Sequence, residues 1–266
     1  MKSIANQISI KTLQILNWLF FFAMITANYL ANALPFNGKT TGELSDQYPN
    51  LFVPAPITFA IWGVIYVLLL FFCIQQSKAF FSKTIDSSTN DLVKKIGFRF
   101  IITCILNIFW ILAWHYEHLF FSVLVMVSLL IQLIDINSKI NKLEITRSFI
   151  IKSSFGVYLG WICIAIIANI TALLVYFGWE GMGQSPSFWT CFMILLGAVI
   201  VSCTLLKLQN SFIGIAVLWA FIGILIARIG AVDYYRFIVW TTVFGIVIVG
   251  TSLIIETTKS VFKNSR

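Results

Sequence analysis

The sequence predicts an all-α membrane protein with eight helices that cross a bilayer. Of its 266 residues, 59% are hydrophobic and only 11% are charged, and the mean hydropathy is +0.93. Soluble domains carry roughly 25% charged residues, so this composition excludes an ordinary soluble fold. Apolar runs of about 20 residues, the length that spans a bilayer as a helix, recur along the whole chain. The alternating strands of a membrane β-barrel are absent from the sequence.

Eight apolar runs are the predicted spans. They are residues 13–34, 57–74, 96–114, 119–134, 154–177, 188–206, 212–229 and 237–255. Lys2 and Lys11 precede the first run, as in a signal peptide, but the run is longer than a signal peptide's apolar core. We therefore expect a retained helix rather than a cleaved leader.

The loop between the first two spans, residues 35–56, contains proline and glycine turn signals. Its content of Tyr48, Leu51, Phe52 and Val53 is too apolar for a simple solvated linker. Two interpretations stay open: the loop folds over a cavity as a lid, or its aromatic rings lie at the depth of the lipid headgroups.

The distribution of positive charge predicts the orientation in the membrane. Of the 18 Lys and Arg residues, all but Lys39, Arg228 and Arg236 lie in the two termini or in the segments on one side of the predicted spans. The positive-inside rule then places both termini in the cytoplasm. The net charge of +8 is thus explained by topology and contact with membrane lipid, and we expect no nucleic-acid partner.

Aromatic and amide residues repeat at helical spacing in three of the spans. The three sets are Tyr158, Trp161, Ala165 and Asn169; Phe59, Trp62 and Tyr66; and Asn107, Trp110 and Trp114. Each set falls on one face of a helix. Three such faces favour one shared pocket for a flat apolar ligand. The alternative is that they are ordinary packing faces between membrane helices.

Ionisable and thiol groups give little indication of catalysis or metal binding. No Asp, Glu, Lys or Arg lies in the middle of a span, which argues against an ion-coupled carrier and leaves no acid–base pair for a hydrolase. The five cysteines all lie in apolar runs and are expected to behave as small hydrophobic residues. His115, Glu117 and His118 could ligate a metal, but no further ligand is available to complete the site. We expect no catalytic residue, metal or cofactor.

Three short motifs on these faces resemble the TspO/MBR family, the tryptophan-rich sensory proteins and translocator proteins. The family's proline-rich entry and W-x-x-L-Y correspond to Pro54, Trp62, Ile65 and Tyr66; L-N-x-x-W to Leu106, Asn107 and Trp110; and Y-L-x-W…A-x-x-L-N to Tyr158, Leu159, Trp161, Ala165 and Asn169. The motifs occur in the family's order. The chain departs from the family at Phe52 and Pro56, where the family's first loop has tryptophans, and at Ile65 and Ala168, where the family has leucines.

The resemblance covers about residues 13–177 and implies a five-helix unit that binds porphyrins or related aromatic ligands. We therefore divide the chain into a TspO-like unit, residues 1–177, and an extension of three transmembrane helices, residues 178–266. The predicted ligand-binding residues are Trp62, Tyr66, Asn107, Trp110, Tyr158, Trp161, Ala165 and Asn169.

The predicted function is a receptor or sensor, in the cytoplasmic membrane of a bacterium, for a flat apolar ligand such as a tetrapyrrole. Two alternatives stay open: a transport component for an apolar solute, and a membrane enzyme that modifies a porphyrin. We expect a binding protein rather than an enzyme. Gly160 and the small residues near Gly197 would also permit the close helix contacts of a homodimer.

Overall fold

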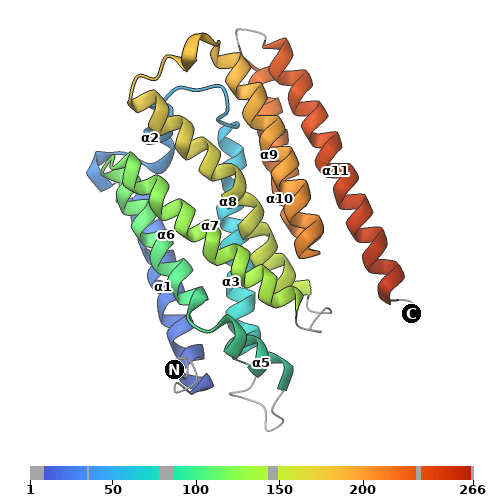
Figure 1. The fold of residues 1–266 in the computed structure, drawn as a ribbon. Helices are drawn as coiled ribbons and strands as arrows, with labels where there is room; N and C mark the ends of the chain where they lie inside the picture. The colour runs from blue at the N-terminus through green and yellow to red at the C-terminus, as the bar shows by residue number, and fades with distance from the viewer. Residues whose placement is uncertain (1–8, 35, 78–86, 143–148, 232–234, 265–266) are drawn as a thin grey trace.

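In a computed structural model the chain forms a bundle of long helices, with no strand among the described residues, 9–34, 36–77, 87–142, 149–231 and 235–264 (Figure 1). The long helices are α1 (Ile10–Ala33), α3 (Ile61–Gln76), α6 (Arg99–His115), α7 (Leu119–Asn141), α8 (Phe149–Tyr176), α9 (Pro186–Leu208), α10 (Ser211–Ile229) and α11 (Arg236–Asn264). Shorter elements are η2 (Phe36–Gly38), α2 (Thr41–Asp46), η3 (Pro56–Ala60), α5 (Ser87–Ile96) and η4 (Gly181–Gly183).

The helices confirm an all-α polytopic membrane protein. Within the described residues, 7 helices are long and apolar enough to cross a bilayer, and the bent pair α5–α6 supplies an eighth crossing when it is counted as one span. Successive spans run in opposite directions, so α1 begins and α11 ends at the same end of the bundle (Figure 1). We call this the lower end; it carries α5. The upper end carries α2.

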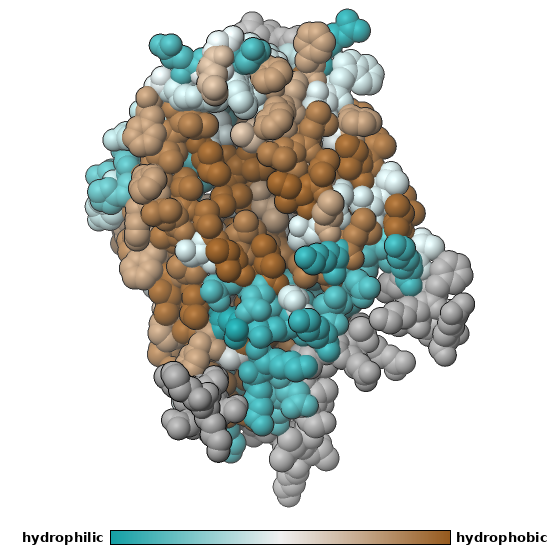
Figure 2. Space-filling model, viewed as in Figure 1, coloured by the Kyte–Doolittle hydropathy of each residue, from teal (hydrophilic) through white to brown (hydrophobic). Residues whose placement is uncertain are grey.

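Hydrophilic residues gather at the lower end. On the face shown in Figure 2, apolar side chains cover the middle of the molecule and hydrophilic ones cluster below them. Two ion pairs lie there, because the Asp135 carboxylate contacts both Arg99 and Lys139. The side of the membrane that each end faces stays a prediction.

Several helix boundaries differ from those expected. The segment before residue 96 was expected to be a polar loop, but residues 87–96 form α5, which meets α6 at a bend of 51°. At the bend Gly97 has a φ of +57°, a conformation that glycine adopts at little cost. Helices α7 and α8 also extend into the loop expected at 135–153, because hydropathy marks only the part of a helix that is apolar.

Helix α10 packs on α8 and η3 at backbone distance, and glycines make this approach possible. A Cβ atom at residue 156 would lie 2.6 Å from Asn210 Nδ2, and one at residue 160 would overlap the carbonyl oxygen of Ile213. Gly223 faces Thr58 of η3 in the same way. Gly160, which we considered for a homodimer contact, thus faces α10 of its own chain; the homodimer itself stays a prediction.

Candidate ligand-binding site

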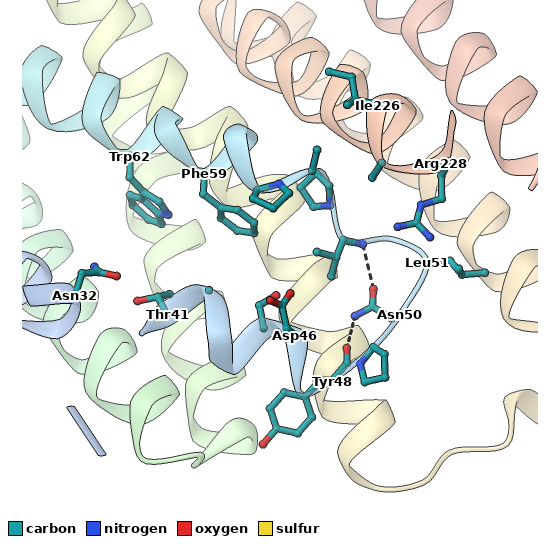
Figure 3. A pocket seen from close by; sticks show the side chains of 18 of the residues that line it. Asn32, Thr41, Asp46, Tyr48, Asn50, Leu51, Phe59, Trp62, Ile226 and Arg228 are labelled. Atoms are coloured by element: carbon teal, nitrogen blue, oxygen red, sulfur yellow. Dashed lines mark hydrogen bonds between the residues drawn. The ribbon is translucent and has the colours of Figure 1, made fainter. Parts of the chain in front are cut away.

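A cavity of about 1730 Å³ opens at the upper end of the bundle. Its walls come from the upper half of α1, the loop that contains α2, η3, the first turns of α3, the upper part of α6, the start of α9 and the end of α10. Figure 3 shows side chains from α1, the loop that contains α2, η3, α3 and α10 around it. The cavity exceeds the usual 300–1,000 Å³ of small-molecule pockets, so a macrocycle has room in it.

Four aromatic rings form a stacked ladder that reaches the cavity. Trp62 of α3 lies between Tyr66 and Trp110, with centroid distances of 5.8 Å and interplanar angles of 27° and 25°. Trp114 continues the ladder at 6.2 Å from Trp110. Trp62, Tyr66 and Trp110 line the cavity. Offset stacking of this kind is a favourable arrangement of aromatic rings, and it holds the indoles in one orientation at the cavity wall.

Asn169 of α8 fixes the orientation of Trp110. The indole Nε1 of Trp110 donates a hydrogen bond of 2.9 Å to Asn169 Oδ1, and Asn169 Nδ2 donates one of 2.8 Å to Ser122 Oγ. Asn169 is only 3% exposed and does not line the cavity. Its amide joins α6, α7 and α8 behind the ladder, where an unpaired polar group would be costly.

A second amide network joins α1, α6 and α8. Asn28 Nδ2 donates to Asn107 Oδ1 at 2.6 Å, and Asn107 Nδ2 donates to the hydroxyl of Tyr158 at 3.2 Å. Asn107 and Tyr158 are buried, whereas Asn28 lines the cavity. The network therefore supports the wall and presents only Asn28 to a ligand.

Trp161 and Ala165 lie behind the cavity wall. The ring of Trp161 contacts those of Phe59 and Trp62 edge-on, at centroid distances of 5.9 Å and 6.1 Å. Its indole N–H is buried and has no hydrogen-bond partner. Ala165, one turn further along α8, is half-buried and packs against the apolar core. Neither residue lines the cavity, although Trp161 backs two residues that do.

The eight predicted residues thus occupy two layers, with Trp62, Tyr66 and Trp110 at the cavity and the other five behind them. Whether they bind a ligand stays a prediction. Sequence reasoning missed several cavity residues: Asn28, Asp46, Arg228 and Tyr235. The sequence offered one signal, since Arg228 is a rare cation inside an apolar run.

The loop between α1 and α3 closes over part of the cavity and is fastened to the end of α6. Tyr48 donates a hydrogen bond of 2.7 Å to Glu117 Oε2, and Lys39 Nζ lies 3.1 Å from Glu117 Oε1. His115 contacts the Thr41 hydroxyl through Nε2 at 3.0 Å and the carbonyl oxygen of Phe36 through Nδ1 at 3.2 Å. These contacts hold residues 36–48 of the loop against the end of α6.

The same contacts shift the pKa values of Glu117 and Tyr48. The hydrogen bonds from Tyr48 and Lys39 hold the pKa of the Glu117 carboxyl below its usual value, because they stabilise the carboxylate. Burial and the neighbouring carboxylate raise the pKa of the Tyr48 hydroxyl, which therefore stays protonated and donates. Within the described part of the chain, no group of three or more His, Cys, Asp and Glu side chains could hold a metal ion.

The model of the family described as TSPO-like protein matches residues 14–255. The match continues beyond residue 177, where we expected the resemblance to end, through α9 and α10 and most of α11. The division of the chain at residue 177 stays a prediction. No curated protein and no solved structure matches the chain. The family match spans most of the sequence and every wall of the aromatic cavity, and the chain belongs to the TSPO-like family.

Proposed function

We propose that this protein is a membrane receptor that binds a flat apolar ligand, such as a tetrapyrrole, in the cavity at the upper end of the bundle. The observation that carries the proposal is the stacked ladder of Tyr66, Trp62 and Trp110 at the cavity wall. Each ring is held in place by stacking on its neighbours, so the three rings form a preformed aromatic wall for a planar molecule. The entropy cost of immobilising these side chains on binding is therefore small.

The size and lining of the cavity support the same proposal. Phe59, Pro54, Pro56 and Leu51 add apolar surface to that of the ladder, and a few amides lie among them. Such a mixture of apolar walls and sparse polar groups is typical of sites for small molecules. We further propose that both termini are cytoplasmic, so that the cavity opens on the opposite side of the membrane.

The test is equilibrium binding of protoporphyrin IX to the purified protein in detergent, followed by the absorption of the porphyrin. Trp62→Leu removes the central ring of the ladder but keeps an apolar side chain. We expect it to weaken binding about tenfold, because Trp62 supports both Tyr66 and Trp110 at the cavity wall and each aromatic pair contributes roughly 0.5–1.5 kcal/mol beyond area burial. The matched control is Trp240→Phe on α11, at a 62% exposed position away from the cavity.

Equal affinity of the wild type and Trp62→Leu, or loss of binding in Trp240→Phe, would contradict this proposal. Incubation of the complex in light and in darkness, with analysis of the pigment, separates a receptor from an enzyme. A receptor returns the porphyrin unchanged. Protein-dependent uptake of porphyrin into the lumen of liposomes would instead indicate transport.

A further inference from the structure

Arg228, a cation at one side of the cavity, has a hydrogen-bond donor without a partner in its own chain. Among the described residues that line the cavity, Arg228 is the one cation and Asp46 the one anion, and no ion pair joins them. Arg228 is half-buried at the last turn of α10, and its Nε is buried without a hydrogen-bond partner. The guanidinium lies 6.0 Å from the ring centroid of Tyr235, which steadies it without satisfying its donors.

A buried guanidinium donor without a partner is unusual and unfavourable. Arginine carries five N–H donors in a planar fork that matches the two oxygens of a carboxylate or phosphate. Asp46, which could pair with it across the cavity, lies on α2 and is exposed. The guanidinium of Arg228 lines the cavity and has no ion-pair partner among the described residues, so it is available to an oxyanion that arrives with a ligand.

Arg228 and the ring ladder lie on different sides of the same cavity. In Figure 3, Trp62 and Phe59 are at one side and Arg228 is at the other, with the loop residues Asp46 and Asn50 between them. A ligand that contacts both sides needs a broad apolar body and an acidic group at its edge. A purely apolar ligand would leave the Arg228 donor unpaired in a partly dehydrated site.

We propose that the cavity selects an anionic amphiphile, whose apolar body lies on the Trp62 ladder and whose oxyanion pairs with Arg228. This inference rests on the proposed function and adds the chemical class of the ligand. It also assigns a role to the C-terminal helices, because α10 supplies the cation that completes the site. The oxyanion has two sources, a carboxylate of the bound small molecule and the phosphate of a membrane lipid.

The first arm of the test compares protoporphyrin IX with its dimethyl ester, which has the same flat body without carboxylates. The wild type should bind the acid more tightly than the ester. Arg228→Gln should weaken binding of the acid about tenfold and leave the ester unchanged, since it removes a charge-assisted hydrogen bond. Arg228→Lys keeps the charge and should retain part of the preference. Arg236→Gln is the matched control, because it makes the same substitution at an exposed arginine that does not line the cavity, and it should not weaken binding of the acid.

The second arm measures thermal stabilisation by phosphatidylglycerol and by diacylglycerol with the same acyl chains. A stabilisation by phosphatidylglycerol that Arg228→Gln abolishes identifies a lipid phosphate as the oxyanion. The inference is overturned if Arg228→Gln changes neither the acid-over-ester preference nor this stabilisation. If neither the wild type nor any variant binds protoporphyrin IX, but phosphatidylglycerol still stabilises the protein in an Arg228-dependent way, the proposed tetrapyrrole ligand is overturned and the inference is kept.

Discussion

The two halves of α8 differ in how they meet their neighbours. The first half approaches α10 at backbone distance through Gly156 and Gly160, and Ser154 Oγ donates a hydrogen bond of 2.7 Å to the carbonyl oxygen of Leu68 in α3. The second half carries Asn169, whose amide accepts a hydrogen bond from the indole of Trp110 at the cavity wall. One helix thus packs tightly on its neighbours at one end and supports the cavity wall at the other.

This difference shows that a buried polar side chain can either join helices to one another or also orient a side chain of the cavity wall. Near the lower end, Asn210 Nδ2 donates to Asn137 Oδ1 at 2.9 Å, and Asn137 Nδ2 donates to the carbonyl oxygen of Phe155 at 3.0 Å. Those amides join helices to one another. At the upper end Asn169 joins three helices and also orients Trp110, a ring of the cavity wall.

The largest expected effect is at the tight half of α8. Gly160→Leu places a side chain where the backbone of Ile213 lies, so α10 must move away from α8. We expect a loss of stability of about 3 kcal/mol or more, because overpacking against backbone cannot be relieved by a rotamer change. Thermal melting in detergent measures it. Gly250→Leu on α11 is the control, since a Cβ there has nothing within 4 Å. Equal melting of the two variants would show that the close approach is not required.

An intermediate effect is expected at Asn169, in the second half of α8. Asn169→Leu keeps the approximate volume but leaves Trp110 Nε1 without its acceptor, whereas Ser122 keeps its hydrogen bond to the carbonyl oxygen of Leu119. We expect a cost of about 1–2 kcal/mol in stability, because hydrogen bonds between membrane helices contribute modestly, and weaker binding of protoporphyrin IX through the freed indole. Thr171→Val is the matched control, since its hydroxyl bonds only to Ile167 of its own helix. A variant with lowered stability and unchanged affinity would mean that Asn169 only joins helices.

The smallest expected effect concerns the loop of residues 36–56, which lies over the cavity. The depressed pKa of Glu117 means that its bonds to Tyr48 and Lys39 stabilise the closed loop above the usual carboxyl pKa and are lost as the pH falls through the lower folded-state value. The carboxylate side chain is 33% exposed, so the contribution is below about 1 kcal/mol.

Limited proteolysis of residues 36–56 between pH 7 and pH 3 measures this effect. The wild type should lose protection as the pH falls, whereas Glu117→Gln should be less protected at pH 7 and nearly independent of pH. The exposed Glu180→Gln is the control and should behave as the wild type. The same pH dependence in Glu117→Gln and the wild type would show that other groups fasten the loop.

Much of the fold could be predicted from the sequence because its signals are local. The apolar runs correspond to the long helices, and the spacing of Trp62 and Tyr66, or of Asn107 and Trp110, brings those residues to neighbouring faces. The helix α5 escaped prediction because its residues are polar and hydropathy does not detect a helix outside the apolar core. The position of Ala165 behind the wall also escaped, since spacing on one helix does not say which neighbour that face meets.

The sequence alone determined that the chain crosses a membrane as helices, that positive charge gathers at one end, and that aromatic and amide residues share helix faces. Each of these follows from composition or period, properties that a single segment carries. The tertiary structure decided which of those residues border the cavity and which stand behind it. It also brought Arg228, more than 100 residues beyond Trp62 in the chain, to the same cavity. Such contacts depend on how helices pack, here on the fit of Gly160 and Gly223 against their neighbours, and no local pattern encodes that fit.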